Sequence, residues 1–186
     1  MKKFLYIFIA TTVSCTHAFA DANPMFGNEN KDAITLYVAQ GTGPGSLFKL
    51  VNPVDWDIVP MSMIMAQYSQ PMTIFRLPAR QNFNVVQNIA YNSGRGLSFI
   101  GAGISWDVTP IVWRGLYVGG GIGPYMRDAH DRWVKSRLVF GEKFFIGANV
   151  SSAWRIELFT LHFSNGDFTA INRGFNFVGL SAGYSF

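Results

Sequence analysis

Hydrophobic and polar residues alternate along most of this chain, a period of two that is typical of β-strands with two different faces. In the segment 97–107, one face carries Ile, Ala and Trp, and the other carries Gly, Ser and Asp. The segments 116–125 and 175–186 show the same contrast. The pattern predicts eight strands, at Ile34–Ala39, Ser62–Ser69, Phe83–Tyr91, Leu97–Asp107, Leu116–Tyr125, Leu138–Val150, Trp154–Ser164 and Phe175–Phe186.

An apolar outer face over a small or polar inner face is the inverse of a soluble protein. Aromatic residues make up 16% of the chain, glycine is abundant, and no apolar run is long enough to span a bilayer as a helix. We therefore predict an all-β fold, an eight-stranded antiparallel transmembrane β-barrel. Trp106, Trp154 and Tyr184 would form an aromatic girdle at the periplasmic end. A secreted soluble β-sandwich is the alternative, and the apolar face on several strands favours the barrel.

An even number of strands places both termini of the chain on one side of the membrane, and the connections alternate between sides. The extracellular set is 40–61, 92–96, 126–137 and 165–174, and the periplasmic set is 70–82, 108–115 and 151–153. The segment 70–82 is long for a periplasmic turn and contains Pro71 and Pro78, so part of it is expected to extend the strands on either side.

The alternation along each strand also predicts which charged side chains face the inside of the barrel and which face the outside. Arg155 and Glu157 lie opposite the apolar face of their strand and are expected inside the barrel, in a polar network that stabilises it. Glu142 and Lys143 are adjacent, so one of them should point outward unless a bulge shifts the register. The sequence leaves open which one does so.

The N-terminus has the features of a signal peptide. Lys2 and Lys3 precede the apolar run Phe4–Val13, and Ala18-Phe19-Ala20 has the small-x-small form of a cleavage site. The expected division is a signal peptide at 1–20 and a barrel at 21–186. Lipoprotein processing at Cys15 is a weaker alternative, because Thr12 stands where a Leu-like residue is expected.

Cleavage would remove 20 of the 186 residues and lower the net charge from +4 to +2, because both Lys2 and Lys3 lie in the removed segment. A mildly basic chain of 166 residues gives no case for nucleic-acid binding. It would also contain no cysteine, which excludes a disulfide. No His, Cys, Asp or Glu cluster has metal-ligand spacing, so we expect no metal and no cofactor.

The end of the seventh predicted strand carries the candidate chemistry. His162 and Ser164 are two residues apart, so they share one face of the strand, and it is the face of its apolar residues. A histidine beside a serine can act as the base that a weakly nucleophilic hydroxyl needs. If that face contacts lipid, the pair is directed at a lipid substrate. The alternative is an ordinary polar pair at the rim of a barrel.

The C-terminal quarter resembles a known family. His162-Phe163-Ser164-Asn165, then Asn172-Arg173-Gly174, then a closing aromatic strand, is similar to the PagL family of outer-membrane lipid A 3-O-deacylases. The resemblance is most specific over 155–186 and is looser over the earlier strands. It implies an eight-stranded barrel in the outer membrane of a Gram-negative bacterium, with a Ser/His site on the outer surface near the outer leaflet.

The resemblance also implies roles by position. Ser164 would be the nucleophile, His162 the general base, and Asn165 a donor to the oxyanion. The family has a glutamate as the third, histidine-orienting member, and the matching residue here is Asn176, a neutral amide on the same outer face. The family glycine that completes the oxyanion hole matches Asp167, with Gly166 one residue earlier. Gly166 is the candidate donor, and Asp167 is an alternative to Asn176 as the third member.

Basic residues on the predicted extracellular loops are candidate contacts for the phosphates of lipid A, or else solvated loop charges. The candidates that we favour are Arg127, Arg132 and Arg173, with Lys135 and Arg137 nearby. The closing strand, which ends at Phe186, resembles the C-terminal signature that the barrel-assembly machinery recognises. The oligomeric state is left open, a homodimer included.

These features together favour a serine esterase that hydrolyses the ester-linked 3-hydroxyacyl chain at the 3-position of lipid A. Lipopolysaccharide in the outer membrane would then be its substrate and its setting. Two other functions stay open at this point. One is a non-catalytic structural or adhesive barrel with a decayed site, and the other is a lipid acyltransferase.

Overall fold

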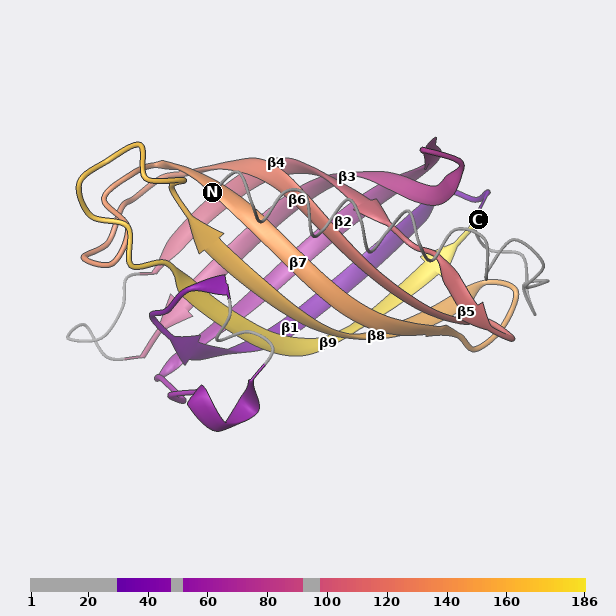
Figure 1. Ribbon diagram of the computed structural model, residues 1–186, viewed down its shortest axis with the longest axis horizontal. Coiled ribbons are helices and arrows are strands. Elements are labelled where there is room, and N and C mark those ends of the chain that lie inside the picture. Colours follow the sequence, from indigo (N-terminus) through magenta and orange to yellow (C-terminus); the bar gives the residue numbers. More distant parts are fainter. Residues whose placement is uncertain (1–29, 48–51, 92–97) are drawn as a thin grey trace.

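The computed structural model describes residues 30–47, 52–91 and 98–186 and shows a closed barrel of tilted strands (Figure 1). The expected signal peptide lies outside the described residues and stays a prediction. The strands are β1 (Ala33–Gly43), β2 (Met61–Ile74), β3 (Leu77–Ala90), β4 (Phe99–Val108), β5 (Ile111–Trp113), β6 (Leu116–Arg127), β7 (Leu138–Asn149), β8 (Trp154–Ser164) and β9 (Phe175–Ser185). A three-residue 3-10 helix, η2 (Pro53–Asp55), lies between β1 and β2.

Eight of these strands form the barrel, and each pairs antiparallel with its neighbours. The order is β4-β3-β2-β1-β9-β8-β7-β6, and pairing of β4 with β6 closes the ring. The short strand β5 adds a hairpin on β6. The predicted eight-stranded antiparallel barrel is therefore confirmed.

The segment 70–82, assigned above to a connection, is mostly strand. β2 and β3 run on past Pro71 and Pro78 and are joined by a two-residue turn at Phe75 and Arg76. Both turn residues have positive φ, at 50° and 68°, as expected for the tight hairpins whose twist matches that of the strands. The long hairpin agrees with the expected extension of both strands.

The two ends of the barrel differ. At one end, Ala33 pairs with Ser185, so the described chain starts beside its C-terminus, close to the short turns (Figure 1). The other end carries the longer connections. There a bridge between Val134 and Asn172, with a hydrogen bond of 2.7 Å from Arg173 N to Trp133 O, joins the β6–β7 connection to the β8–β9 connection.

A buried polar cluster fills the lumen toward the end with the termini. Arg80 contacts Asp107 at 3.1 Å and Glu157 at 2.7 Å, and Lys143 contacts Asp107 at 2.8 Å. The hydroxyl groups of Tyr37 and Tyr117 also donate to Glu157. Buried charged groups need ion-pair and hydrogen-bond partners, because these offset the cost of removing the charges from water. The expected interior position of Glu157 is confirmed, and Arg155, which donates to Thr35, is interior as well.

The cluster also settles the orientation of the adjacent pair in β7. Lys143 is buried in the lumen, and the register of β7 with β8 is continuous from Phe140 to Asn149. Without a bulge, neighbouring residues face opposite sides. Glu142 therefore lies on the outer face.

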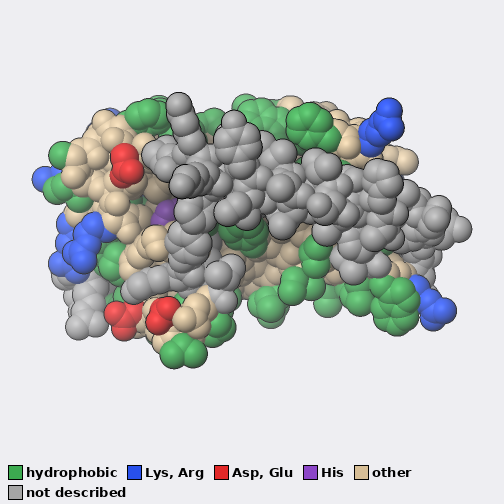
Figure 2. Space-filling model, in the orientation of Figure 1, with side chains coloured by type: hydrophobic (Ala, Val, Ile, Leu, Met, Phe, Trp, Pro, Cys, Tyr) green, Lys and Arg blue, Asp and Glu red, His purple; other side chains and the backbone are tan. Residues whose placement is uncertain are grey.

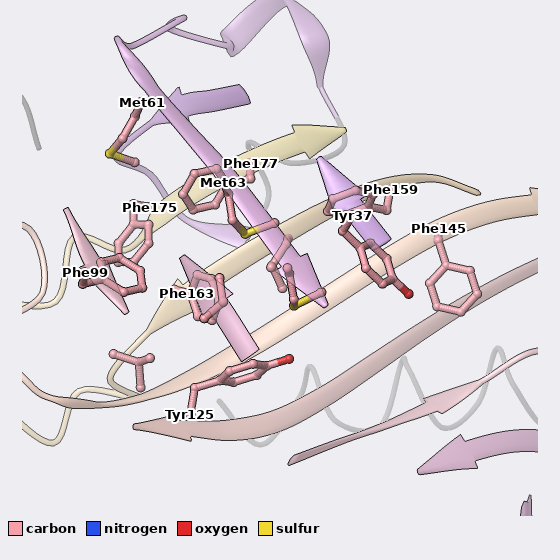
Figure 3. Close-up of a cluster of buried hydrophobic side chains, with 14 of the residues drawn as sticks. Tyr37, Met61, Met63, Phe99, Tyr125, Phe145, Phe159, Phe163, Phe175 and Phe177 are labelled. Atoms are coloured by element: carbon pink, nitrogen blue, oxygen red, sulfur yellow. The ribbon is translucent and has the colours of Figure 1, made fainter. Parts of the chain in front are cut away.

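Large rings fill the rest of the lumen, toward the long connections, so the expectation of a uniformly small or polar interior is wrong for that half. Phe163 packs against Tyr125 at 5.2 Å and against Phe175 at 5.3 Å between ring centroids (Figure 3). The inward glycines make room for these rings. A Cβ added at Gly141 would lie 2.6 Å from the ring of Tyr125. Glycines on one strand thus leave room in the lumen for the aromatic side chains of another strand.

The outer face is apolar. Ile34, Leu36 and Val38 of β1 are about half exposed, and Figure 2 shows hydrophobic side chains along the barrel with charged side chains gathered at its two ends. Trp106, Trp154 and Tyr184 are all partly exposed at the end with the termini, where the girdle was predicted. Trp154 and Tyr184 are also cross-strand partners, with ring centroids 5.1 Å apart.

The buried cluster yields a prediction about stability. Glu157→Leu should lower the free energy of unfolding by about 3 kcal/mol, because it removes one partner of a buried ion pair and leaves Arg80 with a single carboxylate. Urea unfolding of the barrel in detergent micelles, followed by tryptophan fluorescence, measures the change. The outward neighbour provides the control, since Leu158→Ile should change the value by less than about 0.5 kcal/mol. Equal stability of both variants would contradict the role of the cluster.

Candidate functional site

The predicted histidine contact is present. His162 of β8 and Asn176 of β9 are direct cross-strand partners, and His162 Nδ1 lies 2.6 Å from Asn176 Oδ1. An amide oxygen only accepts, so Nδ1 carries the proton and donates it. In the neutral ring Nε2 is then the acceptor. The prediction that the Asn176 amide oxygen holds one ring nitrogen of His162 is confirmed.

Gly174 bounds the other side of the imidazole. A Cβ added at this residue would lie 2.3 Å from His162 Cε1, 3.0 Å from Nε2 and 2.8 Å from the carbonyl oxygen of Gly45. Its φ is +62°, which side chains other than glycine seldom adopt. The backbone of the β8–β9 connection and the start of the β1–β2 connection therefore approach the ring through a position that only glycine fits. Alternation along the strands gives no sign of this constraint, because it depends on the conformation of the loops.

Ser164 is the last residue of β8 and shares the outer parity of His162. Its cross-strand partner in β7 is Phe140, whose ring lies 5.8 Å from the ring of Phe168. These two rings form an aromatic wall next to the hydroxyl. Among the described residues no hydrogen bond joins Ser164 to His162, so the direct contact that their spacing predicted is not formed here. In free enzymes such contacts are often loose and tighten when the substrate binds.

Asn165 is fully buried, and its side chain organises the turn after β8. Its Oδ1 accepts from Asp167 N at 3.0 Å, and its Nδ2 donates to Ile171 O at 3.2 Å and to Thr169 Oγ1. Both amide hydrogens are therefore in use within the loop. This geometry differs from the expected role of Asn165 as a donor to an oxyanion.

Gly166 follows with φ of +61°, and Asp167 also has positive φ, at 63°. Among the hydrogen bonds of the described residues, none uses the Gly166 backbone N–H. Asp167 is exposed, and its Oδ1 accepts from Asn172 Nδ2 at 2.8 Å. Of the two candidates for the residue that holds His162, the structure brings Asn176 to the ring and turns Asp167 toward Asn172.

The expectation that Arg127 contacts substrate is wrong. Arg127 is the last residue of β6, is buried, and lies over the rings of Phe99 and Phe175 at 5.2 and 5.5 Å. Its guanidinium donates to Asp131 at 2.6 Å and to the carbonyl oxygens of Val134 and Ser136. With every side occupied, this arginine stabilises the β6–β7 connection.

Arg132 and Arg173, by contrast, are exposed and line one hollow of about 430 Å³ at the loop end of the barrel. Pro44, Asp57 and Trp133 also line it. Pro44 is next to Gly45, whose carbonyl oxygen approaches Gly174 beside His162. Lys135 and Arg137 are exposed but do not line this hollow. Two of the three arginines favoured from the sequence are therefore accessible near the site.

Comparisons with known proteins bear on the family and the fold. The sequence model of the family described as "Lipid A 3-O-deacylase (PagL)" matches residues 49–185. The crystal structure of the outer membrane enzyme PagL superposes with a TM-score of 0.55 at 10% identity, covering 81% of this chain and 97% of that one. The backbone structure of the Yersinia pestis outer membrane protein Ail gives 0.49 at 12% identity, covering 84% and 99%. No curated protein sequence matches the chain.

The crowding around His162 generates a prediction. Gly174→Ala should displace the imidazole and break its hydrogen bond to Asn176, because the new Cβ would overlap Cε1. The matched control is Gly166→Ala, since Gly166 has nearly the same φ but its Cβ would meet nothing closer than 3.4 Å. The NMR shifts of the His162 ring in micelles should move in the first variant and stay in the second. Equal shifts in both variants would show that backbone strain alone, and not contact with the ring, is responsible.

Proposed function

Because the chain belongs to the lipid A 3-O-deacylase (PagL) family, we propose that it hydrolyses the ester-linked 3-hydroxyacyl chain at the 3-position of lipid A. The protein is an outer-membrane β-barrel, so this substrate lies in the leaflet around it. One observation carries the proposal. His162, which contacts Asn176, shares with Ser164 the outward parity of β8, and both side chains are largely buried on the outer side of the sheet and not in the lumen. A hydrolase that acts on a membrane lipid needs this placement.

The proposed reaction uses the tautomer that Asn176 fixes. His162 Nε2 takes the proton of Ser164 while Ser164 Oγ attacks the ester carbonyl, and the carbonyl oxygen becomes an oxyanion. The tetrahedral intermediate collapses, and the sugar oxygen leaves with the proton that His162 carried. Water then attacks the acyl-enzyme with His162 again as base, which releases the 3-hydroxy fatty acid and restores Ser164. No cofactor enters these steps.

The oxyanion needs hydrogen-bond donors where the charge develops. We assign this role to the backbone N–H of Gly166, two residues after Ser164. The Asn165 side chain supports it indirectly, because its hydrogen bonds to Asp167, Thr169 and Ile171 hold the turn that presents Gly166. This assignment replaces the expected Asn165 donor with a backbone group.

The same surface offers contacts for the rest of the substrate. Phe140 and Phe168 lie beside Ser164 and suit the acyl chain that is cleaved. Arg132 and Arg173, in the hollow at the loop end, suit phosphate groups of lipid A, because a guanidinium can bind phosphate with two parallel hydrogen bonds. The apolar closing strand β9 supports the further proposal that the barrel-assembly machinery inserts the chain.

Mass spectrometry of lipid A from cells that express the protein tests the activity. Expression should remove one hydroxyacyl chain, and Ser164→Ala or His162→Asn should abolish the loss while a heat-modifiable, folded barrel remains. Leu158→Ile, on the lipid face away from the pair, is the control that should keep full activity. A gain of acyl mass would indicate a transferase, and unchanged lipid A with the parent protein would indicate a silent barrel.

A second prediction concerns Asn176. Asn176→Ala should lower kcat by about 10²-fold without unfolding the barrel, because the imidazole loses the contact that fixes its tautomer. Asn176→Glu should keep or raise kcat, since a carboxylate at this position also stabilises the imidazolium that forms. Both rates come from deacylation of purified lipid A in mixed micelles. Full activity of Asn176→Ala together with an inactive Asp167→Ala would move the role to Asp167.

A further inference from the structure

The charged residues of the membrane-spanning strands divide unequally between lumen and lipid. Among the described residues of the eight barrel strands there are seven Asp, Glu, Lys and Arg side chains. Six face inward and are buried, namely Arg80, Asp107, Arg127, Lys143, Arg155 and Glu157. The seventh, Glu142, is on the outer face of β7. It is half-buried, whereas Ile146, four residues along the same face, is exposed.

A carboxylate on the lipid face of a barrel is unfavourable. Ionisable residues in such settings are rare and are commonly retained for a function, with a nearby partner. The strand register identifies the partner. Glu142 pairs with Ile122 on one side and with His162 on the other. Cross-strand partners have Cβ atoms about 5 Å apart, and the diagonal neighbour of Glu142 on β8 is Ser164.

His162 therefore lies between two polar side chains on the outer face. Asn176 of β9 contacts Nδ1, and Glu142 of β7 stands on the opposite side. The backbone near the ring, at Gly174 and Gly45, brings no side-chain charge, and the nearest cation along the chain is Arg173, which is exposed and lines the hollow at the loop end. Within the described residues no ion pair of 4 Å or less joins Glu142 to His162. Any influence of Glu142 on the imidazole thus acts through its charge and not through a hydrogen bond.

We propose that Glu142 is a positioning residue of the site that supplies the negative charge which Asn176 lacks. Asn176 orients the imidazole, and Glu142 stabilises the imidazolium that forms when Ser164 loses its proton. A single carboxylate could both orient the imidazole and stabilise the imidazolium. Here these two roles are divided between Asn176 on β9 and Glu142 on β7. This inference rests on the proposed function for its catalytic meaning, but the electrostatic coupling can be measured whether or not the chain turns over lipid A.

The coupling is measured first by NMR, which needs no substrate. The chain has three histidines, and the His162→Asn spectrum identifies the ring signal of His162. In folded protein in micelles, Glu142→Gln should move the protonation midpoint of His162 to lower pH by about one unit, because the imidazolium loses a nearby opposite charge. Ile146→Gln, on the same face of β7, is the matched control and should leave the midpoint unchanged. An unmoved midpoint in Glu142→Gln overturns the inference.

Kinetics then test its catalytic consequence. Glu142→Gln should lower kcat about tenfold with KM unchanged, because the interaction strengthens only as the imidazolium forms. The acid limb of the pH–rate profile should move to lower pH, in step with the NMR midpoint. Adding Asn176→Glu to Glu142→Gln should restore kcat, since it returns a carboxylate to the imidazole from the other strand.

A loss of activity in Glu142→Gln without movement of the acid limb and without rescue would show a merely structural role and overturn the inference. Failure of the proposed function gives a different result. In that case the parent protein leaves lipid A unchanged, while the His162 midpoint still responds to Glu142.

Discussion

A barrel in a lipid bilayer must pair every backbone N–H and C=O within its own sheet, and this requirement fixes the rest of the structure. Pairing of β4 with β6 joins the two ends of the eight-stranded sheet. Once the ring is closed without bulges in β7–β9, the parity of each residue decides whether its side chain meets lipid or the lumen. A shift of one residue would bring His162 into the aromatic interior and expose Glu157 to lipid. The position of the site is thus a consequence of the register.

The lumen holds that register. The half nearer the termini is a network of the almost fully buried side chains of Arg80, Asp107, Lys143 and Glu157, so exchanging faces would break several ion pairs at once. The half nearer the long connections is packed with aromatic rings that fit over glycines on neighbouring strands. A rigid lumen suits a surface site, because β8 and β9 then present His162 and Asn176 as fixed partners, with no lid required to bring them together.

Features that depend on period two could be predicted from the sequence. The inward Arg155 and Glu157, the outward His162 and Asn176 and the aromatic girdle all follow from alternation, which is local. Arg127 shows how an uncertain strand end misleads. The predicted strand stopped at Tyr125, and two more residues of strand turn Arg127 from a loop charge into a buried one. Gly174 and the hydrogen bonds of Asn165 depend on loop conformation, which alternation does not encode.

The orientation of Glu142 and Lys143 shows a different limit. Both are long charged residues, so nothing within β7 distinguishes them. The decision comes from Asp107 and Gln67 on distant strands, which supply partners for the Lys143 ammonium in the lumen. Glu142 is left opposite His162 as a result, and the surface next to the candidate nucleophile acquires its one carboxylate among the described strand residues.

The central claim is that Ser164 is a nucleophile activated on the lipid face, and covalent trapping tests it most directly. The protein in micelles is treated with a phosphonofluoridate that carries a long alkyl chain, then digested and analysed by mass spectrometry. The account predicts one adduct, on Ser164, and little labelling of the His162→Asn protein. An adduct on another residue, or equal labelling of Ser164 without His162, would contradict it.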